Sequence, residues 1–158
     1  MWGSSAAGDV DDDGEAELVI GTSLSHLYVI DRQGNIELDK NLSGEAIYGT
    51  PTLKDFDNDG DLEIVFGTFN GNLYVMDHDG TVWSNFPVAM GSSDRVIGGC
   101  AVGDITGDGQ PEIAVGTQGN HVYSVDISGN VLNGFPFSTD NRIQGIHPSW
   151  LISTEAAV

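Results

Sequence analysis

One stretch of the chain decides its fold: KDFDNDGDLEIVFGTFNGNLYVMDHDGTV, residues 54–82. Two further stretches align with it without a gap: GDVDDDGEAELVIGTSLSHLYVIDRQGNI from Gly8 and GDITGDGQPEIAVGTQGNHVYSVDISGNV from Gly103. The leading aspartates of their acidic loops, Asp9, Asp55 and Asp104, are 46 and then 49 positions apart. Because self-similarity at such a period is typical of stacked structural units, the chain is predicted to be a repeat protein.

Each repeat has the pattern of four short strands. An approach segment precedes the acidic loop, an apolar run closed by Gly-Thr follows it, and a segment rich in β-branched and aromatic residues comes third. A turn with the pattern Asp-x-x-Gly leads to the fourth strand, which is expected to begin at Ile36, Val82 and Val131. No segment shows the apolar period of an amphipathic helix. Four antiparallel strands in 46 to 49 residues match the size of a β-propeller blade.

The predicted fold is therefore all-β, with three full propeller blades of four antiparallel strands and a partial fourth. The three full blades are assigned to residues 1–45, 46–94 and 95–141. Residues 142–158 are assigned to a degenerate start of a fourth blade or to an exchanged strand, because Ile143-Gln144-Gly145 imitates Ile47-Tyr48-Gly49 but no acidic loop follows. A closed ring needs roughly four to eight blades. The expected partners are thus other blades of the same propeller in a longer chain, or copies of this chain.

Each repeat carries one acidic loop, at residues 9–17, 55–63 and 104–112. Side-chain oxygens recur at loop positions 1, 3, 5 and 9, a glycine holds position 6, and position 7 is expected to offer its backbone carbonyl. An all-oxygen set suits Ca²⁺, whereas transition metals prefer His or Cys, and Mg²⁺ prefers fewer protein ligands and more water. The candidate ligands are Asp9, Asp11, Asp13, Glu15, Glu17, Asp55, Asp57, Asp59, Asp61, Glu63, Asp104, Thr106, Asp108, Gln110 and Glu112.

The main alternative for these loops is an EF-hand, which shares the start D-x-D-x-D-G. An EF-hand requires Glu at position 12, where this chain has Ile20, Phe66 and Val115, and its flanks are helices rather than strands. A merely solvated turn explains one acidic loop as well as a metal does, but three loops in register favour up to three Ca²⁺ sites. The third loop is expected to bind most weakly, because Thr106 replaces a carboxylate and Pro111 stiffens the exit.

Composition limits the partners further. Lys and Arg number 5 against 24 Asp and Glu, for a formal net charge of −19, so no basic face is available for nucleic acid or an anionic membrane surface. The 39% hydrophobic content suffices for a packed core, and no apolar run is long enough for membrane insertion. The N-terminus lacks a signal-peptide pattern, which fits a cytoplasmic protein or a mature or truncated chain, and the repeats favour the latter.

The repeats resemble the FG-GAP/VCBS repeats, the calcium-loop blades of integrin-α-type β-propellers and of many secreted bacterial proteins. Besides the 1-3-5-9 acidic spacing, the aromatic-Gly approach of that family resembles Trp2-Gly3 and Tyr48-Gly49, with Ile97-Gly98 departing at the aromatic. The family's Gly-Ala-Pro resembles Gly21-Thr22-Ser23, Gly67-Thr68-Phe69 and Gly116-Thr117-Gln118, which keep only the glycine. The resemblance covers about residues 1–138 and implies that the loop oxygens are Ca²⁺ ligands.

No catalytic constellation is expected. His26 and His121 align with Asn72 and are therefore variants at one hairpin position, while Cys100 aligns with Ser5, where a small buried residue is expected. The predicted function is a non-enzymatic, calcium-stabilised β-propeller scaffold for extracellular or cell-surface adhesion, ligand binding or assembly, with a protein or glycan ligand. The alternative is a propeller segment of a larger secreted enzyme, such as a polysaccharide-degrading enzyme.

Overall fold

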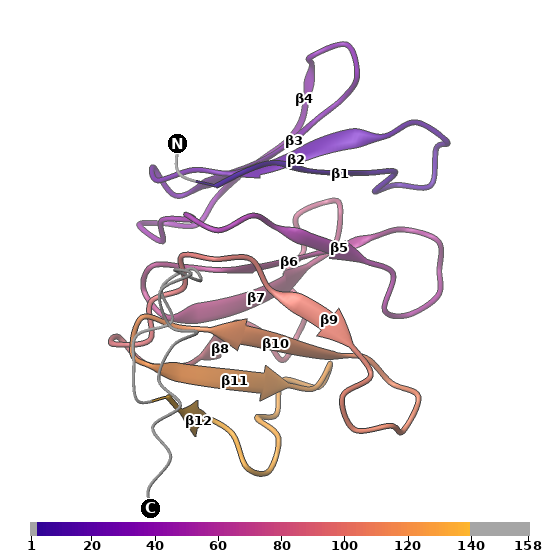
Figure 1. Ribbon diagram of the computed structural model, residues 1–158. Coiled ribbons are helices and arrows are strands. Elements are labelled where there is room, and N and C mark those ends of the chain that lie inside the picture. The colour runs from indigo at the N-terminus through magenta and orange to yellow at the C-terminus, as the bar shows by residue number, and fades with distance from the viewer. Residues whose placement is uncertain (1–2, 140–158) are drawn as a thin grey trace, which may run out of the picture.

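The computed structural model describes residues 3–139, and every regular element in that range is a strand. Twelve strands form three four-stranded antiparallel sheets, which lie above one another (Figure 1). The first sheet, blade 1, contains β1 (Ala6–Gly8), β2 (Glu17–Gly21), β3 (His26–Ile30) and β4 (Ile36–Asn41). The all-β prediction of three four-stranded blades is confirmed.

The other two sheets repeat this arrangement. Blade 2 contains β5 (Thr52–Lys54), β6 (Glu63–Gly67), β7 (Asn72–Met76) and β8 (Val88–Ala89). Blade 3 contains β9 (Ala101–Gly103), β10 (Glu112–Gly116), β11 (His121–Val125) and β12 (Phe137–Ser138). The predicted fourth-blade start or exchanged strand at residues 142–158 lies outside the described residues.

The prediction for the fourth strand is correct in blade 1 and wrong in blades 2 and 3. Val82 and Val131 form only isolated bridges, to Met76 and Val125, and the strand pairing resumes at Val88 and Phe137. In blade 2 the chain leaves the sheet through a turn in which the Phe86 N–H donates to the Trp83 carbonyl at 2.9 Å. The prolines that follow, Pro87 and Pro136, have no N–H for a ladder, so the fourth strand starts after them.

The core lies between the blades rather than within any one of them. The first cluster joins blades 1 and 2 and includes Val19, Leu27, Ile64 and Phe66, each at most 1% exposed. A second cluster joins blades 2 and 3 in the same way, with Val65, Leu73, Ile113 and Val125 at its centre. Each blade therefore buries its apolar side chains only by stacking on a neighbour.

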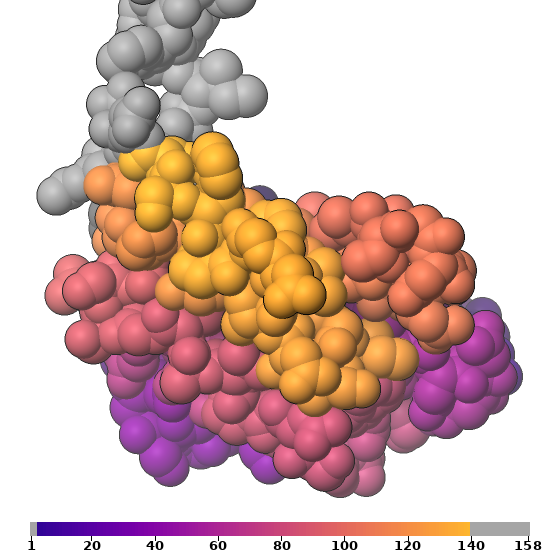
Figure 2. Space-filling view, turned by 90° about the horizontal axis from the view of Figure 1, so that it is seen from below, coloured from indigo at the N-terminus to yellow at the C-terminus, as the bar shows by residue number. Residues whose placement is uncertain are grey.

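This stacking places the three acidic loops at one end of the molecule. Each loop connects the first and second strands of its blade, and the first strands of neighbouring blades lie next to one another. The loops consequently project from the same side of the stack, on the right in Figure 1. In Figure 2, seen from below, the third loop and the loop of blade 2 again lie together at the right-hand edge.

Candidate metal centres

The acidic loops are held in shape by their own carboxylates. In the first loop, Asp9 accepts hydrogen bonds from the N–H groups of Asp13 and Gly14 at 3.1 and 3.0 Å. In the third loop, Asp104 accepts hydrogen bonds from the N–H groups of Gly107 and Gly109 at 2.6 and 2.9 Å. Asp55 accepts from the N–H of residue 58 at 2.6 Å. The position-1 aspartate therefore closes the loop in all three copies.

Position 4 of the loop was missed by the sequence analysis. Asp12, Asn58 and Gly107 all have positive φ, at 55°, 64° and 78°. Asp, Asn and Gly are the residues that tolerate this left-handed conformation best, so their occurrence at position 4 is the signal that was available. Together with the predicted glycine at position 6, this turn folds the loop tightly enough to bring its carboxylates together.

The carboxylates converge in each loop. Three acidic side chains per loop offer oxygen atoms that all lie within 4.8 Å of one another: Asp9, Asp11 and Asp13; Asp55, Asp57 and Glu63; Asp104, Asp108 and Glu112. Taken together, the three groups use loop positions 1, 3, 5 and 9, the positions that the sequence predicted. Glu17 and Asp59 belong to the predicted sets but fall outside these close groups, whereas the Thr106 hydroxyl lies 3.2 Å from Oε1 of Glu112 in the third group.

The glutamate at position 9 is the buried member of each set. Glu17, Glu63 and Glu112 are each 2% exposed. One carboxylate oxygen of each accepts a hydrogen bond from the N–H at loop position 2, at 2.9, 2.7 and 2.7 Å respectively. This bond fixes the orientation of the carboxylate. In the first two loops the other oxygen has no hydrogen-bond donor within the described residues, and it remains for a cation.

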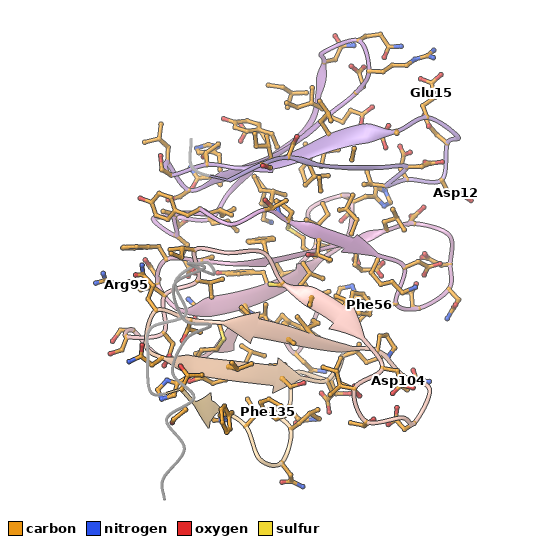
Figure 3. All side chains as sticks on the ribbon, in the orientation of Figure 1. Asp12, Glu15, Phe56, Arg95, Asp104 and Phe135 are labelled. Atoms are coloured by element: carbon orange, nitrogen blue, oxygen red, sulfur yellow. The ribbon has the colours of Figure 1, made fainter. Side chains whose placement is uncertain are left out.

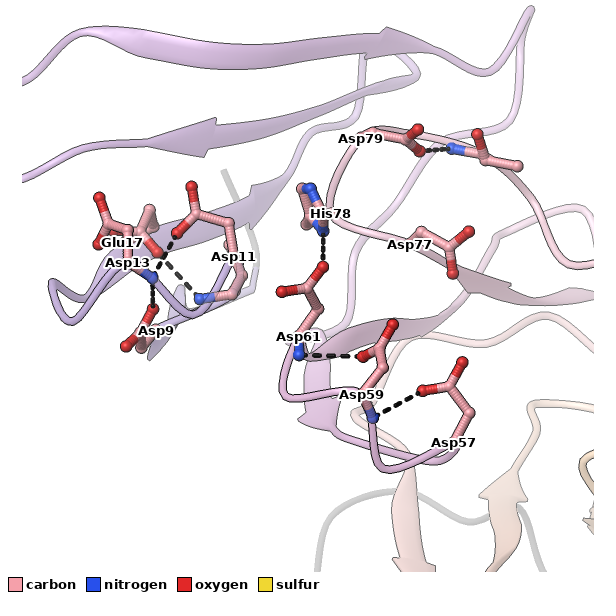
Figure 4. A network of polar contacts seen from close by, with 12 residues as sticks. Asp9, Asp11, Asp13, Glu17, Asp57, Asp59, Asp61, Asp77, His78 and Asp79 are labelled. Carbon is pink, nitrogen blue, oxygen red and sulfur yellow. Dashed lines mark hydrogen bonds and ion pairs between the residues drawn. The ribbon is translucent and has the colours of Figure 1, made fainter.

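In the first two loops the side chain at position 7 has a partner outside the acidic group. The Glu15 carboxylate accepts from Arg32 at 2.6 Å, and the Asp61 carboxylate lies 3.0 Å from Nδ1 of His78. Figure 4 shows that His78 reaches Asp61 from the turn after the third strand of its blade. In these two loops the position-7 side chains therefore have partners outside the acidic groups, and the backbone carbonyl at position 7 stays the predicted ligand.

The third loop differs at Thr106. The Thr106 hydroxyl donates to Oε1 of Glu112 at 3.2 Å, and the Thr106 N–H lies 3.2 Å from Oε2 of the same glutamate. Both oxygens of Glu112 are therefore engaged inside the loop, and the loop has one carboxylate fewer. A cation would have to displace the hydroxyl, which agrees with the prediction that this loop binds most weakly.

The donor set of all three loops fits calcium better than the other common metals. Carboxylate, hydroxyl and carbonyl oxygens are hard ligands, and no histidine nitrogen or cysteine sulfur belongs to any of the three groups within residues 3–139. Burial of the position-9 glutamate in each loop is costly for a charged group unless a cation compensates it. The loops are therefore three candidate Ca²⁺ sites, and calcium, when bound, would neutralise the charge that their carboxylates accumulate.

The pKa of Glu63 predicts how the stability of the metal-free chain depends on pH. Desolvation, together with the negative charges of Asp57, Asp77 and Asp55, outweighs the bond from the Phe56 N–H and raises the pKa of Glu63 to about 7 from 4.5. The folded, metal-free chain thus holds a proton that the unfolded chain releases between these values, so its stability should fall as the pH rises through 7.

Calcium binding at the second loop should show the opposite trend, because the ion requires the deprotonated glutamate. Its affinity is expected to be about tenfold lower at about pH 6 than at about pH 8. Calorimetric titration at both pH values measures this, with Glu63→Gln as the variant that should lose both the second-loop binding and its pH dependence. An affinity that stays constant over this range in the wild-type chain would contradict the assignment of Glu63.

Three histidines of the described residues lie beside carboxylates: His26 beside Asp39, His78 beside Asp61, and His121 beside Asp94. Burial raises the pKa of the Cys100 thiol to about 12, so it stays protonated at neutral pH and is a poor nucleophile. His147 lies outside the described residues.

A second candidate site lies at the opposite end of the stack. Tyr48, Phe69, Ile97 and Gln118, which come from linkers and hairpins of blades 2 and 3, line a cleft of about 330 Å³. The Tyr48 and Phe69 rings meet edge to face at 5.1 Å, and the guanidinium carbon of Arg95 lies 4.6 Å from the centre of the Phe69 ring. Figure 3 shows Arg95 on the side away from Asp12 and Asp104, so the cleft and the acidic loops occupy opposite ends.

Comparison with known families supports the repeat assignment. Residues 55–115 match the model of the FG-GAP-like repeat family. A comparison with curated proteins finds no match. Within residues 3–139, no helix is long and apolar enough to cross a lipid bilayer.

Three solved structures are similar to this chain. The biofilm matrix protein Bap1 of V. cholerae is 23% identical over 81% of this chain and 27% of that protein, with a TM-score of 0.42. A protein of unknown function from Bacteroides caccae is 18% identical over 73% of this chain and 38% of that protein, with a TM-score of 0.46. The structure of BBS1N in complex with ARL6DN, soaked with lead, is 15% identical over 82% of this chain and 52% of that chain, with a TM-score of 0.55.

The match to BBS1N covers 82% of this chain and supports the fold alone. The chain spans between 27% and 52% of the length of the three similar structures. The three blades therefore correspond to part of the matched BBS1N chain.

Proposed function

We propose that this chain, of which residues 55–115 match the FG-GAP-like repeat family, is a calcium-stabilised, non-enzymatic propeller segment. It would serve as a scaffold for adhesion, ligand binding or assembly outside the cell or at its surface. The observation that carries this proposal is the set of three acidic loops in register at one end of the stack, each closed over a glutamate that is 2% exposed. Calcium would make these blades rigid without taking part in a reaction.

The cleft at the opposite end is the proposed ligand site. Its aromatic rings offer flat apolar faces, the Gln118 amide offers a donor and an acceptor, and Arg95 supplies a positive charge on a chain of net charge −19. Such a combination suits a sugar ring or an apolar side chain that carries a carboxylate. No ion pair joins Arg95 to a carboxylate within the described residues, which leaves its guanidinium available.

A glycan array and a cell-adhesion assay, each performed with calcium and with EGTA, test this function. Binding should require calcium, and Phe69→Ala should reduce it strongly. Phe137→Ala is the matched control, because this aromatic side chain is 60% exposed and does not line the cleft. Binding that is unchanged by both EGTA and Phe69→Ala would contradict the proposal, as would hydrolysis of a polysaccharide by the purified chain.

The alternative function is a propeller segment of a larger secreted enzyme. This alternative rests on the same blades, which match 52% of the BBS1N chain, and requires a longer protein. In that case the catalytic residues would lie outside these blades. The segment itself would still serve as a calcium-dependent scaffold.

A further inference from the structure

The first two acidic loops contact each other across the boundary between blades 1 and 2. The Leu62 N–H in the second loop donates to the Val10 carbonyl of the first loop at 3.1 Å. The Asp12 side chain of the first loop also lies against Gly60 of the second, where Oδ2 of Asp12 is 2.9 Å from the position that a Cβ would take. Figure 4 shows the acidic residues of the two loops next to each other. The two candidate calcium loops are thus joined directly.

The hydrogen bond from Leu62 acts on a predicted ligand of the second loop. Leu62 occupies loop position 8, between Asp61, whose carbonyl is the predicted ligand at position 7, and Glu63 at position 9. The Asp61 carbonyl and the Leu62 N–H belong to one planar peptide group. A bond that holds the N–H therefore also fixes the plane in which the carbonyl lies. A cation on the carbonyl would in turn polarise the peptide group and strengthen its N–H as a donor.

The acceptor of this bond is tied to the ligands of the first loop in the same way. Val10 occupies position 2, between Asp9 and Asp11, and is 1% exposed. Its own N–H donates to Oε2 of Glu17, the position-9 glutamate of the first loop, at 2.9 Å. The Val10 backbone therefore connects Glu17 on one side with the peptide group of Leu62 on the other. Ordering of either loop orders this connection.

The Leu62 side chain contributes separately, by packing. Its Cδ1 is 3.0 Å from the position that a Cβ on Gly8 would take, and the side chain packs against the core cluster shared by blades 1 and 2. Position 8 of the first loop is Ala16. Leu62→Ala therefore removes the packing with a residue that the same loop position already holds, and it leaves the N–H in place.

The second and third loops lack this connection. Position 8 of the third loop is Pro111, which has no N–H, so the equivalent bond to the Phe56 carbonyl cannot form. Apart from its chain neighbours, no described residue comes within 4 Å of the position that a Cβ on Gly109 would take, so Asn58 makes no contact like that of Asp12. A hollow of about 340 Å³ lies between these two loops instead, and Asn58 and Pro111 are among the residues that line it.

We propose that calcium binding in the first loop strengthens calcium binding in the second, and the reverse, through the hydrogen bond from Leu62 to Val10, whereas the third loop binds independently. The inference rests on the calcium sites of the proposed function and adds a positioning role for Leu62. An ion in one loop orders the shared peptide groups, so the other loop has less freedom left to lose. Filling one loop should raise the affinity of the other about two- to tenfold, the range of one hydrogen bond, and linkage requires the two factors to be equal.

Calcium titration followed by heteronuclear NMR tests the proposal on the full chain, because the amides of the position-6 glycines report on the loops separately: Gly14, Gly60 and Gly109. Asp11→Asn with Asp13→Asn disables the first loop. This variant removes two negative charges, the same net change that one Ca²⁺ brings, so the charge beside the second loop matches that of a filled first loop. Where the two loops have similar affinity, the Gly60 midpoint should move to about 1.5- to threefold higher calcium, the square root of the coupling factor.

The matched control is the third loop. Asp104→Asn with Asp108→Asn removes the same charge on the other side of the second loop and should leave the Gly60 midpoint unchanged. When the first-loop variant is combined with Leu62→Pro, which copies position 8 of the third loop, the shift should disappear because the N–H is gone. Combined with Leu62→Ala, which keeps the N–H, the shift should persist. The melting temperature in calcium shows whether each variant is folded.

A Gly60 midpoint that does not respond to the first-loop variant would overturn the proposal, as would an equal shift in folded Leu62→Pro. If Leu62→Pro does not fold, the first-loop and third-loop variants still decide, because equal shifts from both would overturn the coupling. Either result would leave three independent calcium sites and the proposed function intact. Glycine amides that respond to millimolar calcium in none of the loops would contradict the sites themselves, and the coupling with them.

Discussion

Removal of calcium should lower the melting temperature of the chain by about 6–12 °C. The three loops hold 14 of the 24 acidic residues. In each loop three carboxylates converge within 4.8 Å, where like charges repel. Extracellular calcium modules have dissociation constants of roughly 10⁻⁴–10⁻³ M, so each loop should add on the order of 1 kcal/mol at millimolar calcium. Three loops then add about 3 kcal/mol, and each kcal/mol shifts the melting temperature of a chain of this size by about 2–4 °C.

Circular dichroism melts in calcium, in EGTA and after calcium is restored measure this effect. Glu37→Gln is a suitable control, because it removes one exposed negative charge near the first loop without touching a candidate ligand. It should keep the full calcium increment, whereas Glu63→Gln should lose at least about a third of it, because the third loop is expected to bind most weakly and to contribute least. A calcium increment below about 2 °C in the wild-type chain would contradict the stabilising role.

Asp94→Ala should destabilise the fold by about 3 kcal/mol, the largest effect expected of a single substitution. Asp94 is 5% exposed and accepts from the Thr117 hydroxyl and from Nδ1 of His121 at 2.6 and 2.7 Å. Although burial alone would raise its pKa, the hydrogen bonds from Thr117, His121 and Tyr123 outweigh burial and lower the pKa of Asp94. Its contribution to stability is therefore present above the ordinary value of 3.8 and is lost as the pH falls through the lowered pKa.

Urea unfolding at neutral pH measures the change through the transition midpoint. Asp94→Asn keeps one acceptor oxygen and should cost less than Asp94→Ala. The control is Ser93→Ala at the exposed neighbouring position, which should change stability by less than about 0.5 kcal/mol. A loss below about 1 kcal/mol for Asp94→Ala would mean that the hydrogen bonds of Asp94 between blades 2 and 3 are not a principal stabilising contact.

The sequence predicted those features that repeat at fixed spacing. The acidic loops, the glycine at position 6 and the first three strands of each blade recur in three copies, so the comparison of copies was sufficient to place them. The fourth strands of blades 2 and 3 were misplaced because hydrophobic Val82 and Val131 suggested a strand, whereas the following turn and proline determine where pairing can resume.

The hydrogen bonds that Glu45 and Asp94 make to the next blade could not be predicted from the sequence pattern. Glu45 and Asp94 lie 23 positions before the threonines that they contact, and the contact crosses from a linker to the next blade. Single acidic residues in linkers are ordinary surface residues by composition, and only the packing of one blade on another buries them. The use of the backbone carbonyl at position 7 of the loops stays a prediction. The pairing of Glu15 with Arg32 and of Asp61 with His78 could not be predicted, because it depends on the hairpin geometry of each blade.

Calcium titration of the metal-free chain, followed by isothermal calorimetry, tests the central claim most directly. The three loops of the wild-type chain should bind three ions per chain, with the Thr106 loop binding most weakly. The combined variant Asp55→Asn, Asp57→Asn and Glu63→Gln should bind two, and Glu37→Gln should still bind three. The claim would be contradicted by no binding at millimolar calcium, or by a stoichiometry that the combined variant leaves unchanged.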